Sequence, residues 1–135
     1  MVRYMGNLMA LIYVSDLRRS VDFYTEKLGF SLVGYWDGEE KAIKPTYDEA
    51  HTPGFAMVRA GEARVGLHIW EGESAPPAGG VGLDLRVDDV DAFYRELTER
   101  GVQASEPRDF PWGQRMIFLK DPDGHPWSFY SPIGD

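Results

Sequence analysis

Two stretches of this chain follow the same plan, and this internal repeat limits the possible folds more than any other feature. "LIYVSDLRRSVDFYTEKLGF" occupies residues 11–30, and "LDLRVDDVDAFYRELTERGV" occupies residues 83–102. Each begins with a short alternating apolar strand, continues through an acidic step into an amphipathic helix, and ends with a glycine and an apolar residue. A repeat of this kind predicts two copies of one supersecondary unit.

The two predicted helices, near residues 16–28 and 89–100, share the same pattern of apolar residues, N-terminal caps and a glycine after the last turn. Their apolar residues recur at helical spacing. These residues are Leu17, Val21, Tyr24 and Leu28 in the first helix and Val90, Phe93, Tyr94 and Leu97 in the second. Acidic or hydroxyl side chains can cap the free N–H groups where each helix begins. The candidate caps are Ser15 or Asp16, and Asp88 or Asp89. Gly29 and Gly101 suit the left-handed residue that follows a helix.

Three strand-like segments, separated by turn signals, follow each predicted helix. They are 30–36, 55–60 and 64–70 in the first half, and 102–106, 115–120 and 127–130 in the second. Residues 37–53 form a polar loop, and the Pro- and Gly-rich "EGESAPPAGG" at 71–80 is a linker by composition. The predicted fold class is α+β, with βαβββ modules at about 8–70 and 81–132. We expect one domain over 1–135, because neither half alone buries both faces of its sheet.

Composition sets broad limits on location and partners. The chain has 135 residues and no cysteine, which excludes disulfides, thiolate zinc sites and cysteine nucleophiles and fits a reducing cytoplasm. The apolar run at 8–14 is too short to span a bilayer and lacks a cleavage site, so we expect a cytoplasmic protein without membrane contact. The net charge of −8 disfavours nucleic acid. A negative surface serves solubility or attracts a cationic ligand.

Three motifs resemble those of the vicinal-oxygen-chelate superfamily, which includes glyoxalases, bleomycin resistance proteins and dioxygenases. They are "VSDLRRSVDFY…LGF", "VDDVDAFYRELTERGV" and "PWGQRMIFLKDPDG". The resemblance covers almost the whole chain and is closest to the bleomycin-resistance branch. It implies two modules whose curved mixed sheets form a cleft, and a homodimer. It says little about the reaction, because this fold hosts many functions.

The resemblance also implies where a catalytic metal would be bound. Metal-dependent members carry His, Gln or Glu seven residues before the Asp that opens each helix, and on the last strand of each half. Here these positions are Met9, His68, Gly82 and Ser128. Met offers a soft thioether, Gly has no side chain and Ser is rarely a ligand. Asp84 lies roughly 6.5 Å from Gly82 along the strand, too far to replace it. We therefore expect no metal and no other cofactor.

The segment "DPDGHPWS" at 121–128 brings two carboxylates close together, but turn chemistry explains both. Asp121 and Asp123 can bond nearby backbone N–H groups, Pro122 presets φ, and Gly124 supplies a left-handed residue. This pair is therefore interpreted as part of a turn and not as a general acid–base couple. His125, which follows the turn, and His51, in the polar loop, are expected to be solvated.

Strand alternation predicts which side chains face the cleft. The set is Tyr13, His68, Trp70, Asp84, Arg86 and Tyr130, with Trp36 and Trp112 at the cleft mouth. Trp127 falls on the helix side and is expected in the core. Aromatic walls with a few carboxylates stack on flat cationic molecules and neutralise them. Arg86 on the same face either contacts the ligand or is paired with Asp84.

Two hypotheses follow from these residues. The first is a metal-free protein that binds and sequesters a bulky, aromatic, cationic small molecule, with no catalytic residue. The second is an enzyme of the glyoxalase or dioxygenase type, either a divalent-metal lyase, isomerase or dioxygenase or a metal-free lyase that uses His68. The aromatic lining and the degenerate metal positions favour the first.

Overall fold

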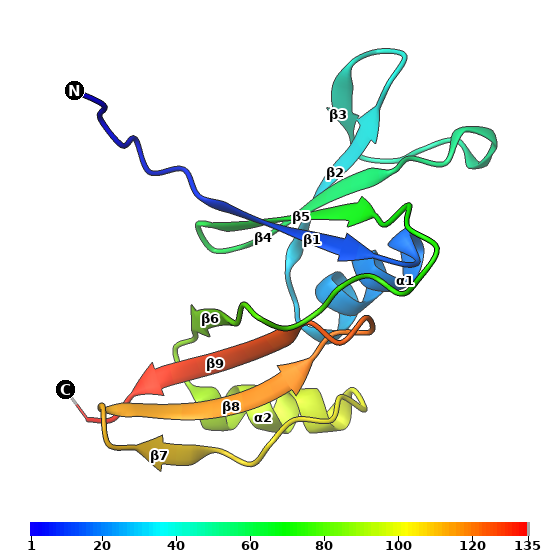
Figure 1. Ribbon diagram of the computed structural model, residues 1–135. Helices are drawn as coiled ribbons and strands as arrows, with labels where there is room; N and C mark the ends of the chain where they lie inside the picture. Colours follow the sequence, from blue (N-terminus) through cyan, green and yellow to red (C-terminus); the bar gives the residue numbers. More distant parts are fainter. Residues whose placement is uncertain (135) are drawn as a thin grey trace. The chain divides into compact units, whose positions relative to one another are not determined.

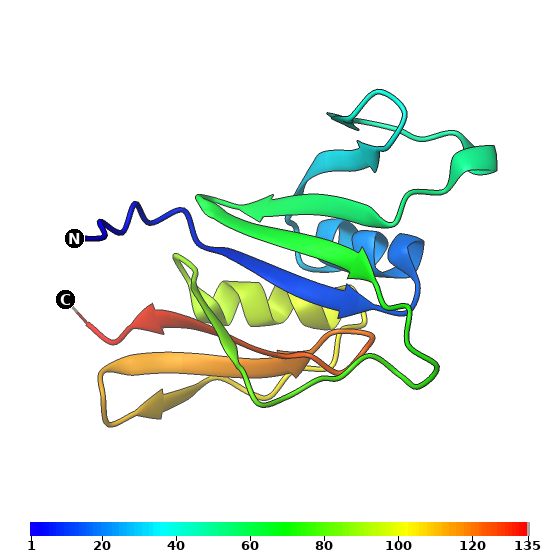
Figure 2. The same cartoon turned by 45° about the horizontal axis from the view of Figure 1, so that its top comes forward.

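The computed structural model describes residues 1–134, which form two units of α+β structure (Figures 1 and 2). Unit 1 covers Met1–Ser74, and unit 2 begins at Ala75. The boundary lies inside the Pro- and Gly-rich segment 71–80. Each unit has one mixed sheet with a helix against one of its faces.

Unit 1 has a five-stranded sheet in the order β1-β5-β4-β2-β3. Strands β1 and β5 are parallel, and the other pairs are antiparallel. The strands are β1 (Met9–Val14), β2 (Ser31–Asp37), β3 (Ala42–Lys44), β4 (Phe55–Ala60) and β5 (Ala63–Ile69). The helices are α1 (Leu17–Asp22), the π-helical η1 (Phe23–Lys27) and the 3₁₀ turn η2 (Glu49–His51). The helix expected near 16–28 is confirmed, with its second half wound as a π-helix.

Unit 2 repeats this topology with a four-stranded sheet in the order β6-β9-β8-β7. Strands β6 and β9 are parallel, so the first and last strands of the module are neighbours, as β1 and β5 are in unit 1. The elements are β6 (Leu83–Arg86), α2 (Val90–Glu99), β7 (Arg108–Phe110), β8 (Gln114–Lys120) and β9 (Pro126–Pro132). The prediction of an α+β fold built from two βαβββ modules is confirmed.

The predicted caps explain where both α-helices begin. The Asp16 carboxylate accepts the Arg19 N–H at 3.0 Å, and the Asp89 carboxylate accepts the Ala92 N–H at 3.0 Å. Each bond satisfies a donor that has no partner inside the helix. Ser15 and Asp88, the alternative candidates, therefore do not cap the helices.

The core of each unit lies between the sheet and its helix. In unit 1 the buried strand residues are Ile12, Val14, Ala56, Val58, Val65 and Leu67. In unit 2 they are Met116, Ile117, Leu119, Trp127 and Phe129. The Trp127 ring is 4% exposed and stacks on Phe129 with centroids 5.7 Å apart, which confirms that Trp127 belongs to the core. The other face of each sheet is not covered by the helix of its own unit.

The strand predicted at 102–106 is wrong, since the corresponding strand is β7 at Arg108–Phe110. The predicted segment 102–106 is hydrogen-bonded to β8 at Ser105. The Ser105 N–H donates to the Phe118 carbonyl at 2.9 Å, and the Ser105 hydroxyl accepts the Phe118 N–H at 2.8 Å. A side chain thus replaces the carbonyl that would continue a ladder, and Pro107 cannot donate a backbone hydrogen bond.

The polar loop predicted at 37–53 also needs correction, because it contains β3 and η2. Strand β3 pairs with β2 as an antiparallel hairpin, and its residues Ile43 and Lys44 approach Gly34 closely. A Cβ at Gly34, whose φ is +153°, would lie 2.5 Å from Ile43 Cγ2 and 2.6 Å from the Lys44 carbonyl oxygen. Glycine at this position therefore permits the close approach, and the hairpin projects from unit 1 as an arm (Figure 1).

Candidate functional site

The face of the unit 1 sheet that points away from α1 carries an aromatic surface. Tyr13 on β1 and Phe55 on β4 both pair with His68 on β5. The Tyr13 ring lies 6.0 Å from His68 and 5.4 Å from Trp70, edge to face in both cases. We call Tyr13, Phe55, His68 and Trp70 the unit 1 aromatic face. The structure thus brings together three residues that the alternation predicted, and adds Phe55.

Polar atoms of this face are held by the backbone. Trp70 Nε1 donates to the Ser74 carbonyl at 3.1 Å, which fixes the indole beside Tyr13. His68 Nδ1 lies 2.8 Å from the Ile69 carbonyl oxygen. A carbonyl can only accept, so this contact requires a proton on Nδ1. In the neutral ring, Nε2 is then the acceptor available to a ligand.

Gly66 lies at the centre of this face. A Cβ built on it would lie 2.8 Å from Phe55 Cε1 and 3.1 Å from Leu11 Cδ1. The missing side chain therefore leaves the room that the Phe55 ring and the Leu11 methyl group fill from the two neighbouring strands. Any larger residue would push the aromatic ring away from the sheet.

In unit 2 the open face carries a charged pair of positions and a tyrosine. Asp84 pairs with Ser128, and Arg86 pairs with Tyr130, across the β6–β9 ladder. The Ser128 hydroxyl donates to the Asp84 carboxylate at 3.0 Å. Within the described residues the Arg86 guanidinium makes no hydrogen bond or ion pair, so the alternative in which Asp84 pairs with Arg86 is wrong. The donors of Arg86 are therefore not used by protein groups among the described residues.

Trp112 forms part of an aromatic stack at the β7–β8 turn. Its ring lies 4.8 Å from Phe110 at an interplanar angle of 23°, and Phe110 meets Phe118 edge to face at 5.8 Å. The Arg108 guanidinium lies 5.1 Å over the Phe110 ring. Trp112 Nε1 donates to Gln114 at 3.0 Å, and the indole is still 63% exposed. One face of the indole is covered by Phe110, and much of its surface remains accessible.

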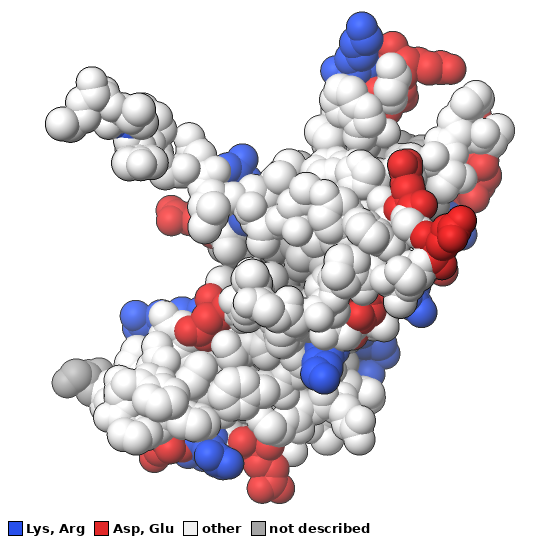
Figure 3. Space-filling view, in the orientation of Figure 1, with Lys and Arg blue, Asp and Glu red and all other residues white. Residues whose placement is uncertain are grey.

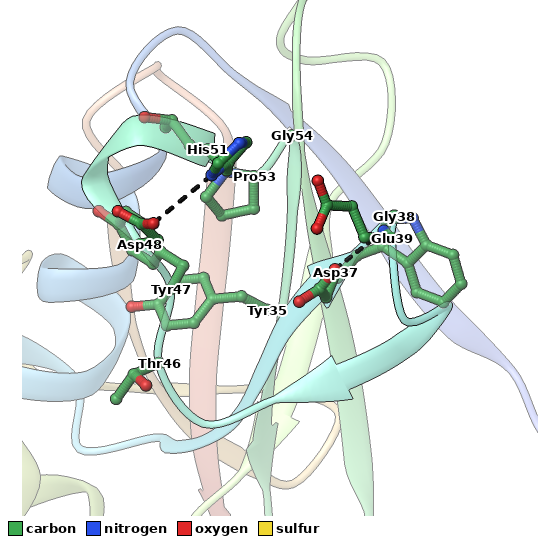
Figure 4. Close-up of a pocket in the computed structure, with 12 residues that line it drawn as sticks. Tyr35, Asp37, Gly38, Glu39, Thr46, Tyr47, Asp48, His51, Pro53 and Gly54 are labelled. Atoms are coloured by element: carbon green, nitrogen blue, oxygen red, sulfur yellow. Dashed lines mark hydrogen bonds and ion pairs between the residues drawn. The ribbon is translucent and has the colours of Figure 1, made fainter.

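Trp36 borders a hollow of about 550 Å³ between the β2–β3 hairpin and the segment that carries η2 (Figure 4). We call it the arm hollow. Its lining residues are Tyr35, Trp36, Asp37, Gly38, Glu39, Thr46, Tyr47, Asp48, His51, Thr52, Pro53 and Gly54. Tyr35 and Tyr47 meet edge to face with centroids 4.8 Å apart. The sequence placed Trp36 at the mouth of a cleft and did not predict this hollow.

Two carboxylates of the arm hollow are held by backbone N–H groups. Asp37 accepts from the N–H groups of Glu40 and Glu39, and these bonds lower the pKa of Asp37. Asp48 accepts the Ala50 N–H at 3.0 Å, which lowers the pKa of Asp48. Bonds from neutral donors stabilise the charged form of a carboxyl group. Both groups are therefore anionic at neutral pH.

Basic residues beside the hollow are already paired. Arg18 on α1 donates to the Tyr47 hydroxyl at 2.8 Å and is also bonded to Glu49. These two partners raise the pKa of Arg18. Lys44 forms an ion pair with Glu40, and Figure 3 shows basic and acidic side chains together at the tip of the arm.

The registers of the two sheets revise one of the four positions implied for a metal. Met9 precedes its helix cap by seven residues and pairs with Arg64, and Gly82 is one residue before Leu83, which pairs with Trp127. Ser128 is thus two residues beyond the partner position of Gly82. The equivalent residue in unit 1 is Gly66, not His68.

None of the revised positions carries a side chain that suits a divalent metal. Met9 has a thioether, Gly66 and Gly82 have no side chain, and the Ser128 hydroxyl is bonded to Asp84. Across residues 1–134, no group of three or more His, Asp or Glu is arranged to hold an ion. The residues present therefore do not fit the metal that the fold suggests.

The β8–β9 turn has the structural role predicted for it. Asp121 is 5% exposed, and its carboxylate accepts the N–H groups of Asp123 at 3.0 Å and His125 at 2.8 Å. Gly124 has φ of +88°, as the turn requires. The Asp121 carboxylate is thus committed to the backbone of the turn.

Comparison with known proteins agrees with this architecture. The family model of the Glyoxalase/Bleomycin resistance protein/Dioxygenase superfamily matches residues 6–129. The chain belongs to this superfamily. It is 26% identical over 139 residues to a bleomycin resistance protein of Geobacillus stearothermophilus, covering 89% of this chain and 92% of that protein.

Solved structures of the superfamily superpose on the chain over nearly its full length. TnmS3, an antibiotic binding protein from Streptomyces sp. CB03234, is 29% identical with a TM-score of 0.67, covering 96% of this chain and 99% of that one. A glyoxalase/bleomycin resistance protein/dioxygenase from Nocardioides has a TM-score of 0.73 at 23% identity, covering 98% and 87%. The second match supports the fold alone. In the described part of this chain, no helix is long and apolar enough to cross a membrane.

Proposed function

We propose that this superfamily member binds an aromatic, cationic small molecule and sequesters it without a metal and without chemical conversion. The observation that carries the proposal is the accessible aromatic surface on the open side of each sheet. Tyr13 and Trp70 provide it in unit 1, and Phe110 and Trp112 provide it in unit 2. The names of the relatives, a bleomycin resistance protein and an antibiotic binding protein, support a small-molecule ligand.

Stacking and charge supply the binding energy in this proposal. An aromatic pair contributes about 0.5–1.5 kcal/mol beyond the buried area, and a cation on an aromatic face contributes up to about 2 kcal/mol when desolvated. Asp84 and the net charge of −8 attract a cation. Arg86, with its donors free of protein partners among the described residues, favours a ligand that also carries a carbonyl or another acceptor.

The alternative of a His68-assisted lyase lacks an orienting group. A general base of this kind works with a partner that holds the ring and stabilises its charged form. In unit 1 the contact of His68 Nδ1 is the neutral carbonyl of Ile69, at 2.8 Å. The geometry therefore supports His68 as a wall of the binding surface.

We also propose that the protein forms a homodimer. Residues 1–8 precede β1 as an extended segment, which we call the N-terminal arm (Figure 1). Its large apolar side chains are between 75% and 121% exposed, and they are Met1, Val2, Tyr4, Met5 and Leu8. Apolar surface of this kind is typical of segments that are covered by a partner. We expect a cytoplasmic protein whose partners are this second copy and the small-molecule ligand, with neither nucleic acid nor membrane.

The proposed binding function is tested by titrating a bleomycin-type glycopeptide while following tryptophan fluorescence. We expect saturable quenching, and we expect Trp70→Ala and Trp112→Ala each to weaken binding about tenfold, equivalent to ~1.4 kcal/mol. Leu32→Ala, an exposed apolar position of β2, serves as the control and should bind like the wild type. Mass spectrometry of the recovered ligand supplies the second readout. Time-dependent conversion to a product would refute sequestration and favour the enzyme.

A further inference from the structure

We infer that the arm hollow is a second small-molecule site, which takes a flat organic cation. It lies beside α1, because Arg18 of that helix donates to Tyr47 in its wall. Tyr35 pairs with Ala56, a core residue on the helix side of the sheet, so this wall does not belong to the unit 1 aromatic face. The inference does not depend on the function proposed above.

The size of the hollow argues for an organic molecule. Its volume is about 550 Å³, whereas small-molecule sites span about 300–1,000 Å³. A bare metal ion needs ligand atoms within about 2.0–2.6 Å, and a space of this volume cannot provide such contacts on all sides. The hollow is bounded by the hairpin on one side and by residues 46–54 on the other (Figure 4).

Aromatic rings form much of the lining. Tyr35 and Tyr47 are locked edge to face, and the Tyr47 hydroxyl accepts from Arg18 at 2.8 Å, which holds the pair against α1. Trp36, the next residue of β2, points to the opposite side of the strand from Tyr35, is 44% exposed and borders the hollow at its rim. Rings fixed in this way offer flat surface without the entropy cost of ordering a mobile side chain.

The charges in the hollow select a cation. Asp37 and Glu39 approach from the hairpin, and Asp48 approaches from the opposite side (Figure 4). The basic groups beside the hollow, Arg18 and Lys44, are bonded to Glu49 and Glu40. Lys44 also attracts the Asp37 carboxylate, so the negative charge that remains for a ligand comes mainly from Glu39 and Asp48. His51 lies 3.5 Å from Asp48 and carries charge only when protonated.

Aromatic walls and negative charge together favour a cationic heterocycle over a neutral one. The cation gains from the quadrupole of the rings and from the carboxylates at once. An anion of the same shape would meet three carboxylates and is excluded. We therefore assign the ligand class as a flat aromatic carrying a fixed positive charge, of a size up to that of three fused rings.

The test compares N-methylacridinium with acridine, which has nearly the same shape and is neutral at pH 7.5. Binding to the full chain is followed by the fluorescence of the probe. We expect the cation to bind at least about tenfold more tightly, from cation–π and charge contributions together. Equal affinities for the two probes would overturn the inference.

Variants locate the binding. Glu39→Gln and Asp37→Asn should each weaken N-methylacridinium binding about threefold to fivefold, as expected for one exposed charge pair, and Trp36→Ala by about fivefold or more. The Asp37→Asn side chain keeps an oxygen that accepts the backbone N–H groups, so the turn is retained. Glu62→Gln removes the same charge at an exposed turn outside the hollow and should change little.

Two results distinguish binding at the arm hollow from binding at the unit 1 aromatic face. Trp70→Ala, which alters the unit 1 aromatic face, should leave N-methylacridinium binding to the hollow unchanged. A loss in Trp70→Ala without a loss in Glu39→Gln would place the cation on the aromatic face and overturn the inference. Because Glu39 is exposed on a turn, its substitution tests the site even if Trp36→Ala does not fold.

Discussion

Ser128 and Asp84 lie side by side on neighbouring parallel strands, and the serine hydroxyl donates to the carboxylate at 3.0 Å. The resemblance to metal-dependent members of the superfamily implies a ligand at the position of Ser128. Here the Ser128 hydroxyl is hydrogen-bonded to Asp84, the carboxylate that lies nearest to the position of a missing ligand. The pair therefore gives unit 2 a small polar patch in which the serine hydroxyl is already bonded to the carboxylate.

This arrangement predicts that the wild-type protein holds no divalent metal after dialysis against a chelator. Gly82→His with Ser128→Glu should introduce zinc affinity, because a Cβ at Gly82 meets no atom within 4 Å and Gly82 directly precedes β6, which pairs with the strand that carries Ser128. Isothermal titration with zinc is the measurement, and Gly82→Ala with Ser128→Ala is the matched control. Stoichiometric metal in the dialysed wild type would contradict the prediction.

Gly66→Ala should destabilise the fold by about 1–3 kcal/mol, the usual cost of overpacking. The added methyl group would lie 2.8 Å from Phe55 Cε1, so the ring must leave its place on the aromatic face. Urea denaturation measures the effect, and Gly82→Ala, which has open space around its Cβ, is the control. Combining Gly66→Ala with Phe55→Leu should recover much of the loss. Without such recovery, the cost lies in the backbone or in the contact with Leu11 and not in the Phe55 ring.

Asp121→Ala should cost about 1–3 kcal/mol of unfolding free energy, because two backbone donors in a partly buried turn lose their acceptor. The donors are the N–H groups of Asp123 and His125. Asp121→Asn keeps an acceptor oxygen and should cost less. Thermal or urea unfolding distinguishes the two variants, and equal losses would show that charge, not hydrogen bonding, holds the turn.

Acid stability should depend in part on Asp37. Its folded pKa lies below the unfolded value because the N–H groups of Glu40 and Glu39 bond its carboxylate, so the unfolded chain binds more protons as the pH falls. The contribution is present above the unfolded pKa of about 4 and is lost as the pH drops through the lower folded value. Urea midpoints between pH 3 and 6 should therefore fall less steeply for Asp37→Asn. An unchanged slope would contradict this.

Much of the fold followed from local patterns that tertiary contacts did not override. The helices, their caps at Asp16 and Asp89 and the core position of Trp127 all depend on periodicity and capping that short segments encode. The strand at 102–106 failed because the Ser105 side chain takes the place of a ladder carbonyl, a local exchange that residue type does not reveal.

The binding surfaces were less predictable than the core. Alternation correctly grouped Tyr13, His68 and Trp70, and its extension along β4 would also have found Phe55, which pairs with His68. The arm hollow depends on Gly34, which lets β3 cross close to β2, and on Arg18, which holds Tyr47 against α1. Both are contacts between residues that are not neighbours in the chain, and no short sequence pattern signals them.

The N-terminal arm should decide the oligomeric state. Gly6 and Asn7 have φ of +84° and +51°, so the chain turns just before β1, which is an edge strand of the unit 1 sheet. Of residues 1–8, Arg3 carries charge and is basic, which leaves −9 for the rest of the chain (−8 minus 1). A cationic, apolar arm is thus complementary to the anionic body of a second copy, and an edge strand offers it unpaired backbone groups.

Light scattering at micromolar concentration should give about twice the chain mass of 15.3 kDa for the wild type. Replacing Val2, Tyr4, Met5 and Leu8 by Ser should shift the protein to the monomer, because the apolar contacts of the arm are lost. Leu32→Ser, at an exposed apolar residue outside the arm, should remain dimeric. A monomeric wild type would refute the homodimer. A dimer that persists in the arm variant would show that the copies associate through another surface, the exposed aromatic stack at Trp112 being the next to substitute.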